Sequence, residues 1–258
     1  MPGQATTGLE PEQFEELVAR VGELLVWDCG RGRPRALTLR QAVKAVVMYF
    51  RTNVTEELIG ELLFVDQTTI SRLIAELEGT ITEVLDEFVP DLADLAEETD
   101  GRVGVVDGSL CPCWSWVQAP ELYSGKHQTT GHGHQFVCGL AGDLLHISDP
   151  LPGKTHDAKA IHDTGLVDIL GDDNAIGDKG YLGTGVTTPF RKPAGGELLN
   201  WQKEFNTIIN QLRYVVERVI ANFKTWRCMH TDYRRPRHTY ATAFRAVRAL
   251  HFFKLRFA

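Results

Sequence analysis

Three acidic side chains stand where they could act on the same substrate. Asp107 ends the apolar run GVVD and Asp178 ends AIGD, and a glycine follows each of them within two residues. Both runs are typical of central strands, so we expect the two carboxylates at a sheet edge, where strands end and loops begin. Glu217 lies on an otherwise apolar helix stretch, where a carboxylate is costly unless it has a partner.

Carboxylate oxygens are ligands that Mg²⁺ and Mn²⁺ prefer, and these ions also bind phosphate. Two such ions about 3.5–4 Å apart can activate a water and stabilise the leaving oxygen of a phosphoryl displacement. Asp107, Asp178 and Glu217 are therefore candidate ligands of two divalent ions and candidate catalytic residues. Taken singly, each could equally be a turn aspartate or a surface glutamate.

The net charge of −7 hides an uneven distribution. Residues 1–100 carry 8 basic and 20 acidic side chains, residues 101–200 carry 7 and 11, and residues 201–258 carry 12 and 3. The last quarter, which contains Glu217, thus has an excess of +9. Such an asymmetry is one indication of a nucleic-acid partner, although a basic, solvated helix face gives the same count.

The overall composition is that of a globular protein. The 43% of hydrophobic residues argue against a disordered, collagen-like or disulfide-scaffold chain. The sequence has no run of about 18 apolar residues, and its start is acidic rather than basic and apolar as in a signal peptide. Five scattered cysteines fit reduced thiols. We therefore expect a soluble, intracellular protein.

The N-terminal part is expected to be helical. Apolar residues recur with the helical period over 10–26, the segment 29–35 (CGRGRPR) is a break, and a second helix is expected to begin after an N-cap at Thr38. Its predicted inward-facing residues are Val43, Val46, Val47 and Phe50.

Two further helices have the outline of a helix-turn-helix within about residues 38–88. TEELIGELL and QTTISRLIAELEGTITEVLDEFV are separated by a short break, with Asp66 as the N-cap candidate of the second helix. In this motif the start of the second helix contacts DNA bases. A plain helical hairpin fits equally well, and the acidic flanks would oppose phosphate. The predicted DNA-reading residues are Gln67, Thr68, Ser71 and Arg72.

The acidic segment 91–102 is where the helical pattern gives way to strands, so we place a domain boundary there. We expect a helical domain over 1–98 and an α/β domain over 99–258. In the second domain, strands are predicted up to Asp107, at about 134–140 and 144–149, and up to Asp178, with a helix from about Thr155 and one or two long helices over 198–226.

Two further groups of residues are candidates with simpler alternatives. Asp157 rivals Asp178 as the second acid, but in the first turn of a helix it gains from the helix dipole without any metal. A group of cysteines and histidines could form a zinc site, but its C-x-C and H-x-H spacings differ from those usual for zinc. Buried thiols and histidines in turns are the simpler interpretation. The residues concerned are Cys111, Cys113, His132, His134 and Cys138.

Four segments, in this order and after a helix-turn-helix, carry a family resemblance. They are GVVDGSLCPC, PGKTHDAKAI, GDKGYLG and NQLRYVVERVIANFKTWR. Together they resemble the DDE superfamily of transposase endonucleases, in particular the bacterial insertion-sequence branch related to Harbinger-type transposases. The resemblance extends over nearly the whole chain from about Leu37.

The resemblance implies an α/β, RNase H-like mixed sheet with flanking helices, preceded by an all-α helix-turn-helix domain. It implies that Asp107, Asp178 and Glu217 hold two Mg²⁺ (or Mn²⁺) ions. The implied reaction is hydrolytic cleavage at transposon ends, followed by attack of the 3′-hydroxyl on target DNA. The implied partners are double-stranded DNA and a second copy of the chain, in the cytoplasm and associated with the nucleoid. Asn210 stands where related transposases carry a tyrosine.

Basic residues around Glu217 are the remaining DNA-binding candidates. Arg213 and Lys224, at i−4 and i+7 from Glu217, fall on roughly one helix face and would hold phosphates, unless they only form surface charge pairs. The basic run after them would add salt-sensitive backbone contacts. Two alternatives stay open: an inactive, transposase-derived DNA-binding protein, and a phosphohydrolase of small esters. The further candidates are Lys126, Arg227, Arg234, Arg235 and Arg237.

Overall fold

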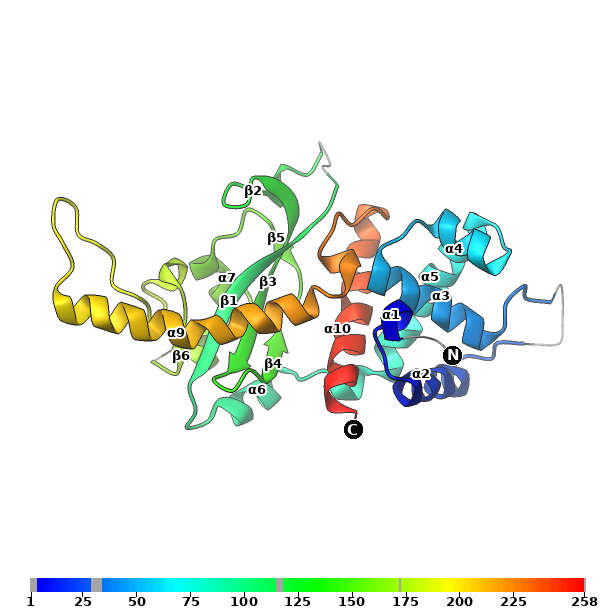
Figure 1. Cartoon of the computed structure of the whole chain (residues 1–258), viewed down its shortest axis with the longest axis horizontal. Coiled ribbons are helices and arrows are strands. Elements are labelled where there is room, and N and C mark those ends of the chain that lie inside the picture. Colours follow the sequence, from blue (N-terminus) through cyan, green and yellow to red (C-terminus); the bar gives the residue numbers. More distant parts are fainter. Residues whose placement is uncertain (1–3, 29–33, 115–117, 172, 258) are drawn as a thin grey trace. The chain divides into compact units, whose positions relative to one another are not determined.

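The structure is a computed structural model that describes residues 4–28, 34–114, 118–171 and 173–257 (Figure 1). It divides into two compact units. A helical unit contains the residues up to Val89 together with those from Lys224 on, and an α/β unit contains Pro90–Phe223. Residues 29–33, which include Cys29 and most of the predicted break, lie outside the described residues.

The helical unit consists of α-helices and short 3₁₀ turns. The predicted cap of α3 is confirmed, because the Thr38 hydroxyl accepts the Gln41 N–H at 3.3 Å and the Gln41 side chain accepts the Thr38 N–H at 2.9 Å. All four predicted inward residues of α3 are buried. The elements are α1 (Gln4–Thr7), α2 (Pro11–Leu24), α3 (Leu39–Thr52), α4 (Glu56–Leu63), α5 (Gln67–Val84), η1 (Asp86–Phe88), η4 (Arg227–Met229), η5 (Arg237–Thr239) and α10 (Tyr240–Arg256).

The C-terminal helix α10 belongs to the core of the helical unit. Ten of its residues are buried, and it packs against α5. A helix buried to this extent gains most of its stability from tertiary packing. The compact units therefore differ from the two consecutive domains expected from the sequence, since the chain enters the α/β unit and returns to the helical unit.

This return largely cancels the charge asymmetry of the sequence. Residues 1–89 carry 8 basic and 15 acidic side chains, and residues 224–258 carry 9 and 1, so the unit they form has a net charge of only +1. Arg235, which is only 8% exposed, is a C-terminal cation that pairs with acidic residues of the N-terminal part. Its Nη1 is 2.9 Å from Glu78 Oε2, and its Nε is 3.3 Å from Glu56 Oε1.

We predict that Arg235→Gln destabilises the helical unit by about 3–5 kcal/mol, because it leaves the Glu78 carboxylate buried without its cation. Burial already raises the pKa of Glu78, and Arg235 opposes that rise. Urea denaturation would measure the loss. The neighbouring Arg237→Gln is the matched control, since Arg237 is exposed. A loss below about 1 kcal/mol would contradict the assignment of Arg235 as a structural cation.

The α/β unit is built on a six-stranded mixed sheet, which confirms the predicted α/β fold. The strand order is β2-β3-β1-β6, with β4 and β5 also paired to β3. β1 runs antiparallel to β3 and parallel to β6. The elements are α6 (Leu92–Thr99), β1 (Gly104–Pro112), η2 (Pro120–Leu122), β2 (Tyr123–Ser124), β3 (Thr129–Gly139), β4 (Leu144–Ile147), β5 (Leu151–Pro152), α7 (Asp157–Asp163), α8 (Val167–Leu170), β6 (Ala175–Ile176), η3 (Lys179–Tyr181) and α9 (Asn200–Phe223).

The core of this unit includes a helix that precedes the predicted boundary. Leu95 of α6 is fully buried in one cluster with Val106 of β1, Val137 of β3 and Ile161 of α7. Residues 90–98, expected in the helical domain, thus pack with the sheet, because the amphipathic α6 places its apolar side chain there.

Two strand and helix predictions differ from the structure. β1 continues for five residues beyond Asp107, because Gly108–Pro112 keep pairing with β3. The helix predicted from Thr155 is instead two short helices, α7 and α8, separated by a bend at Gly165, whose φ of +73° favours glycine.

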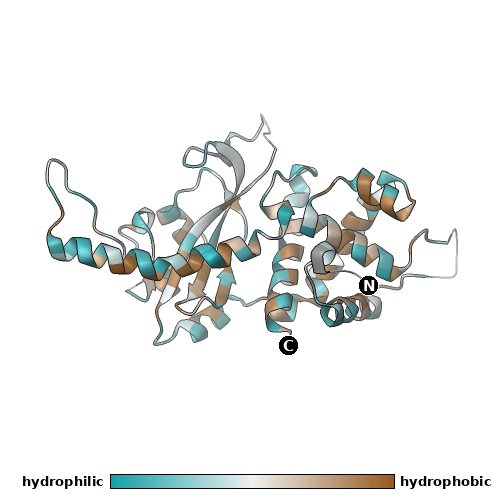
Figure 2. Cartoon of the chain, viewed as in Figure 1, coloured by the Kyte–Doolittle hydropathy of each residue, from teal (hydrophilic) through white to brown (hydrophobic). Residues whose placement is uncertain are grey.

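The helix α9 is a single amphipathic helix. In Figure 2 it alternates between hydrophilic and hydrophobic colours along its length. Its buried side chains are Ile209, Val215, Val216, Val219 and Phe223. No helix in the described part of the chain combines the length and the apolar character needed to cross a membrane.

Candidate active site

The parallel pairing of β1 with β6 brings the first two predicted acids together. Gly104 is paired with Ala175 and Val105 with Ile176, and this register, continued by two residues, sets Asp107 across from Asp178, whose charge acts on Asp107. Asp178 lies two residues past the end of β6 and caps η3, where its Oδ1 accepts the Gly180 N–H at 2.6 Å. Asp107 lies inside β1 and not at its end, which corrects the predicted position.

Asp107 is the more enclosed of the two carboxylates. Its side chain is 16% exposed, and its Oδ2 lies 3.4 Å from Arg213 Nη2 of α9. Burial raises the pKa of Asp107 to about 6; Arg213 opposes this rise and the charge of Asp178 adds to it. Burial thus makes the charged form of Asp107 more costly, and positive charge beside it favours ionisation.

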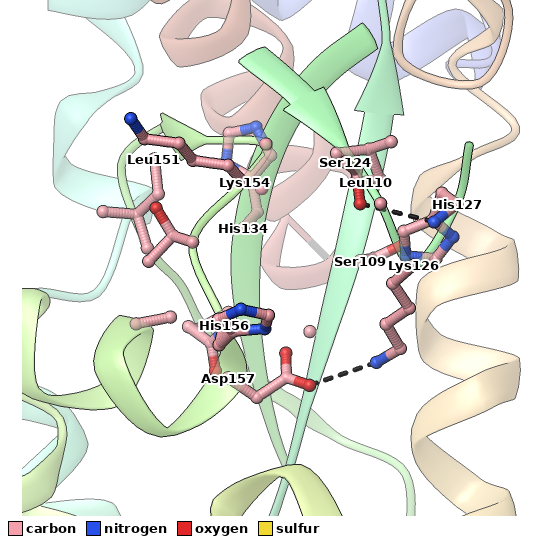
Figure 3. Close-up of a pocket in the computed structure, with 17 residues that line it drawn as sticks. Ser109, Leu110, Ser124, Lys126, His127, His134, Leu151, Lys154, His156 and Asp157 are labelled. Carbon is pink, nitrogen blue, oxygen red and sulfur yellow. Dashed lines mark hydrogen bonds and ion pairs between the residues drawn. The ribbon is translucent and has the colours of Figure 1, made fainter. Parts of the chain in front are cut away.

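A third aspartate, Asp157, lies near this pair, and Lys126 contacts both Asp157 and Asp178. Lys126, between β2 and β3, places its Nζ 3.1 Å from Asp157 Oδ2 and 4.0 Å from Asp178 Oδ2, and Figure 3 shows the Lys126–Asp157 contact. The lysine is half-exposed, so this pairing is weak in energy and easily displaced. Asp157 is the first residue of α7 and lies in its first turn, as expected. Its carboxylate pairs with Lys126, and His156 occupies the N-cap position of the helix.

A glycine makes the close approach of the two carboxylates possible. A Cβ atom on Gly180 would lie 2.6 Å from Asp157 Oδ2 and 2.7 Å from Asp178 Oδ1. The two oxygens are therefore within roughly 5 Å of each other, and any side chain at Gly180 would push them away. Sequence reasoning missed this grouping, although the glycine of the GDKGY motif was its signal.

Glu217 is not part of this cluster. Its side chain is exposed on α9, whereas Arg213, one turn earlier, is the α9 side chain that reaches Asp107. Within the described ranges, no group of three or more His, Cys, Asp or Glu side chains has an arrangement that could hold a metal, and this includes the cysteine–histidine group considered for zinc. The structure thus assembles the aspartates without the glutamate.

The chemistry of the aspartate cluster still fits a divalent cation. Asp107 and Asp178 offer hard oxygen donors side by side, and the cations Arg213 and Lys126 already partly compensate their charge. Oxygen donors of this kind suit Mg²⁺ or Mn²⁺ rather than a soft metal. Asp107 and Asp178 could therefore hold such an ion, with Asp157 close by.

A cavity of about 160 Å³ lies beside the cluster (Figure 3). It is smaller than the sites of drug-sized ligands, so it suits a single small group. Asp157 and Lys126 form part of its lining, together with Ser109, Lys154 and His156.

The predicted DNA-reading residues lie at the start of α5. Gln67, Thr68 and Arg72 are exposed and Ser71 is partly buried, which leaves the helix start accessible as a helix-turn-helix requires. Asp66 occupies the N-cap position of α5, as predicted, although its side chain forms no capping hydrogen bond.

The basic run after α9 divides into surface and structural residues. Arg227 is exposed and Lys224 is partly buried. Arg234 donates through Nη2 to the carbonyl of Asn53. Arg235 is buried between two glutamates, so the predicted phosphate contact of Arg235 is replaced by a role inside the helical unit.

Comparison with known proteins agrees with this organisation. Residues 106–251 match the family described as DDE superfamily endonuclease, and residues 35–87 match the helix-turn-helix of DDE superfamily endonuclease. The chain belongs to the DDE superfamily of endonucleases, and its N-terminal region contains the helix-turn-helix of that family. Both the resemblance and the motif inferred from the sequence are thereby confirmed.

Two curated relatives extend over most of the chain. It is 30% identical over 225 residues to a putative transposase for insertion sequence element IS112 of Streptomyces albus G, covering 86% of this chain and 83% of that protein. It is 25% identical over 216 residues to a probable transposase for insertion sequence element IS702 of Microchaete diplosiphon, covering 79% and 76%. No solved structure matches the chain.

We predict that Arg213→Gln raises the pKa of Asp107 above about 6, because the Arg213 guanidinium lowers that pKa and glutamine carries no charge. A pH titration of the Asp107 carboxyl carbon by NMR measures the change. Lys203→Gln, at an exposed position on the same helix, is the control and should leave the titration unchanged. An unchanged or lowered pKa in Arg213→Gln would show that the 3.4 Å contact does not form in solution.

Proposed function

We propose that this chain is a DNA transposase of the insertion-sequence type, which cleaves DNA at transposon ends and joins the freed 3′-hydroxyl to target DNA in a metal-dependent reaction. The observation that supports this most is the placement of Asp107 opposite Asp178 in the β1–β6 register of a DDE superfamily endonuclease. The transposase names of the two relatives support the same substrate class.

In this proposal Asp107 and Asp178 are metal ligands, and Glu217 is the third. When bound, two Mg²⁺ or Mn²⁺ ions would activate the attacking oxygen and stabilise the leaving oxygen of an in-line displacement. Glu217 is exposed in this structure, so its part requires its side chain or α9 to move on binding.

Each step is a phosphoryl transfer that forms one phosphorus–oxygen bond and breaks another. A water oxygen attacks phosphorus at the transposon end, loses its proton, and the bond from phosphorus to the 3′-oxygen breaks, which leaves a 3′-hydroxyl and a 5′-phosphate. The 3′-hydroxyl then attacks a target phosphodiester, forming one phosphorus–oxygen bond while another breaks. Arg213 and Lys126, beside the aspartates, would bind the negatively charged phosphate oxygens.

DNA would be recognised by the helical unit. Gln67, Thr68, Ser71 and Arg72 of α5 would read the terminal inverted repeats, because they lie at the exposed start of the second helix of the motif. Lys224, Arg227 and Arg234 would supply backbone contacts. Two transposon ends must meet, so we propose a homodimer or a larger assembly on DNA, in the cytoplasm and associated with the nucleoid.

The proposal predicts that Asp107→Asn and Asp178→Asn each lower Mg²⁺-dependent cleavage of a terminal-repeat duplex by at least about a hundredfold, because each removes charge from the site where the phosphoryl group reacts. DNA binding should stay within about threefold of the wild type. Asp168→Asn, at an exposed position of α8, is the matched control. Denaturing gel electrophoresis of end-labelled DNA measures cleavage of each strand.

The same assay separates the competing outcomes. Cleavage that persists without a divalent ion would contradict the proposal. A wild-type chain that binds the repeats but does not cut with Mg²⁺ or Mn²⁺ would instead be a transposase-derived DNA-binding protein. Comparing Glu217→Gln with Asp157→Asn would show which of these acids completes the site.

A further inference from the structure

A strongly basic cavity lies in the helical unit, away from the start of α5. It has a volume of about 700 Å³ and is formed by the end of α3 and the segment that follows α9. None of its described lining residues is acidic. We call it the Arg51 pocket; its lining residues are Arg51, Thr52, Asn53, Lys224, Thr225, Arg227, His230 and Thr231.

Arg51 is held in position by three different contacts. Its Nη1 donates a hydrogen bond to the hydroxyl of Thr225, and its guanidinium carbon lies 5.7 Å from the centre of the Trp226 ring. Gly8, with a φ of +71°, packs so tightly that a Cβ atom there would lie 2.9 Å from Arg51 Cδ. Burial lowers the pKa of Arg51, but a guanidinium stays charged at neutral pH. The cation is therefore preorganised.

The opposite wall is fixed to the end of α3 by Asn53. This residue, at a φ of +51°, ends α3, and its Nδ2 donates to Thr231 Oγ1 at 2.6 Å and to the Asp232 carbonyl at 3.2 Å. The Thr231 hydroxyl in turn donates to the Arg227 carbonyl at 2.8 Å. These bonds hold the turn η4 beside α3, so that the exposed Arg227 and His230 line the same cavity as Arg51.

Cations near the end of a helix often serve only to compensate its carbonyl dipoles. Here the last turn of α3 is already closed by the Asn53 N–H, which donates to the Tyr49 carbonyl at 2.8 Å, and Arg234 donates to the Asn53 carbonyl. Arg51 instead bonds to Thr225, and Arg227 and His230 come from another segment. Several cations around one cavity are a setting that suits phosphate oxygens.

We propose that the Arg51 pocket binds the phosphate backbone of double-stranded DNA, and that most sequence-independent DNA affinity of the chain arises there rather than at α5. This rests on the proposed function insofar as DNA is the substrate. The helix α5 is a poorer phosphate site, because its neighbours on α4 and α5 include Glu57, Glu61 and Glu76. The cavity beside the aspartates contains Asp157.

The test is the salt dependence of binding to a duplex of about 30 base pairs of arbitrary sequence, with the full chain and without divalent metal. In Arg51→Gln/Arg227→Gln, the slope of log K against log salt should fall by about 1.8, because each lost phosphate contact removes about 0.9. At 0.1 M salt the affinity should drop about eightfold for each lost contact. Fluorescence anisotropy measures both quantities.

Two control variants isolate the pocket. Arg245→Gln removes the same charge from an exposed position of α10 outside the pocket and should leave the slope unchanged. Arg51→Lys/Arg227→Lys keeps both charges and should retain most of the slope. Thermal unfolding of every variant shows whether the helical unit is intact.

Three results with the variants would overturn the inference, and two results with the wild-type chain separate it from the proposed function. A slope in Arg51→Gln/Arg227→Gln equal to that of Arg245→Gln would show that phosphates do not bind there. A lowered Tm with an unchanged slope would make these cations helix-end stabilisers. Loss of inorganic phosphate binding without loss of DNA binding would make the cavity a small-anion site. Salt-sensitive binding by a wild-type chain that does not cut DNA refutes only the proposed function, whereas absence of DNA binding overturns both.

Discussion

The candidate site depends on a short piece of parallel sheet. β1 and β6 share only two residue pairs, yet these pairs direct the chain so that Asp178, two residues past β6, lies close enough to Asp107 to influence its pKa. β1 is held on its other side by a nine-residue antiparallel pairing with β3, so Asp107 lies in a strand that is paired along its whole length. β6 gains an additional bridge from Ile176 to Thr187. The extensively paired β1 and the short β6 thus lie side by side where the two candidate metal ligands are expected to act.

The helical unit depends on charges from both ends of the sequence, because a cation of the C-terminal segment pairs with acidic residues of the N-terminal part. Arg235 places a buried cation between Glu56 and Glu78, which lie on different helices of the helix-turn-helix region. Because a buried carboxylate is unfavourable without a cation, the C-terminal segment stabilises this region. Other cations of the C-terminal segment, Lys224 and Arg227, line the cavity around Arg51, whose described lining contains no acidic residue.

The features that the sequence predicts correctly are those set by residues close together in the chain. Helical periodicity and the Thr38 cap give α3, and the apolar runs give β1 and β6. It does not predict that β1 continues past Asp107, because Gly108–Pro112 are ordered by pairing with β3, a contact distant in sequence. The return of α10 to α5, and the side chain of α9 that faces Asp107, are likewise set by tertiary packing, which carries no periodic signal.

The discontinuous helical unit also has a consequence for synthesis on the ribosome. The α/β unit, Pro90–Phe223, is contiguous in the chain and can fold as soon as it has emerged, whereas the helical unit, begun first, is completed last. Until α10 emerges, α5 lacks its packing partner and Glu78 lacks its cation. A nascent chain therefore passes through a stage in which the α/β unit can fold before the helical unit, and termination before α10 would leave α5 without this packing partner.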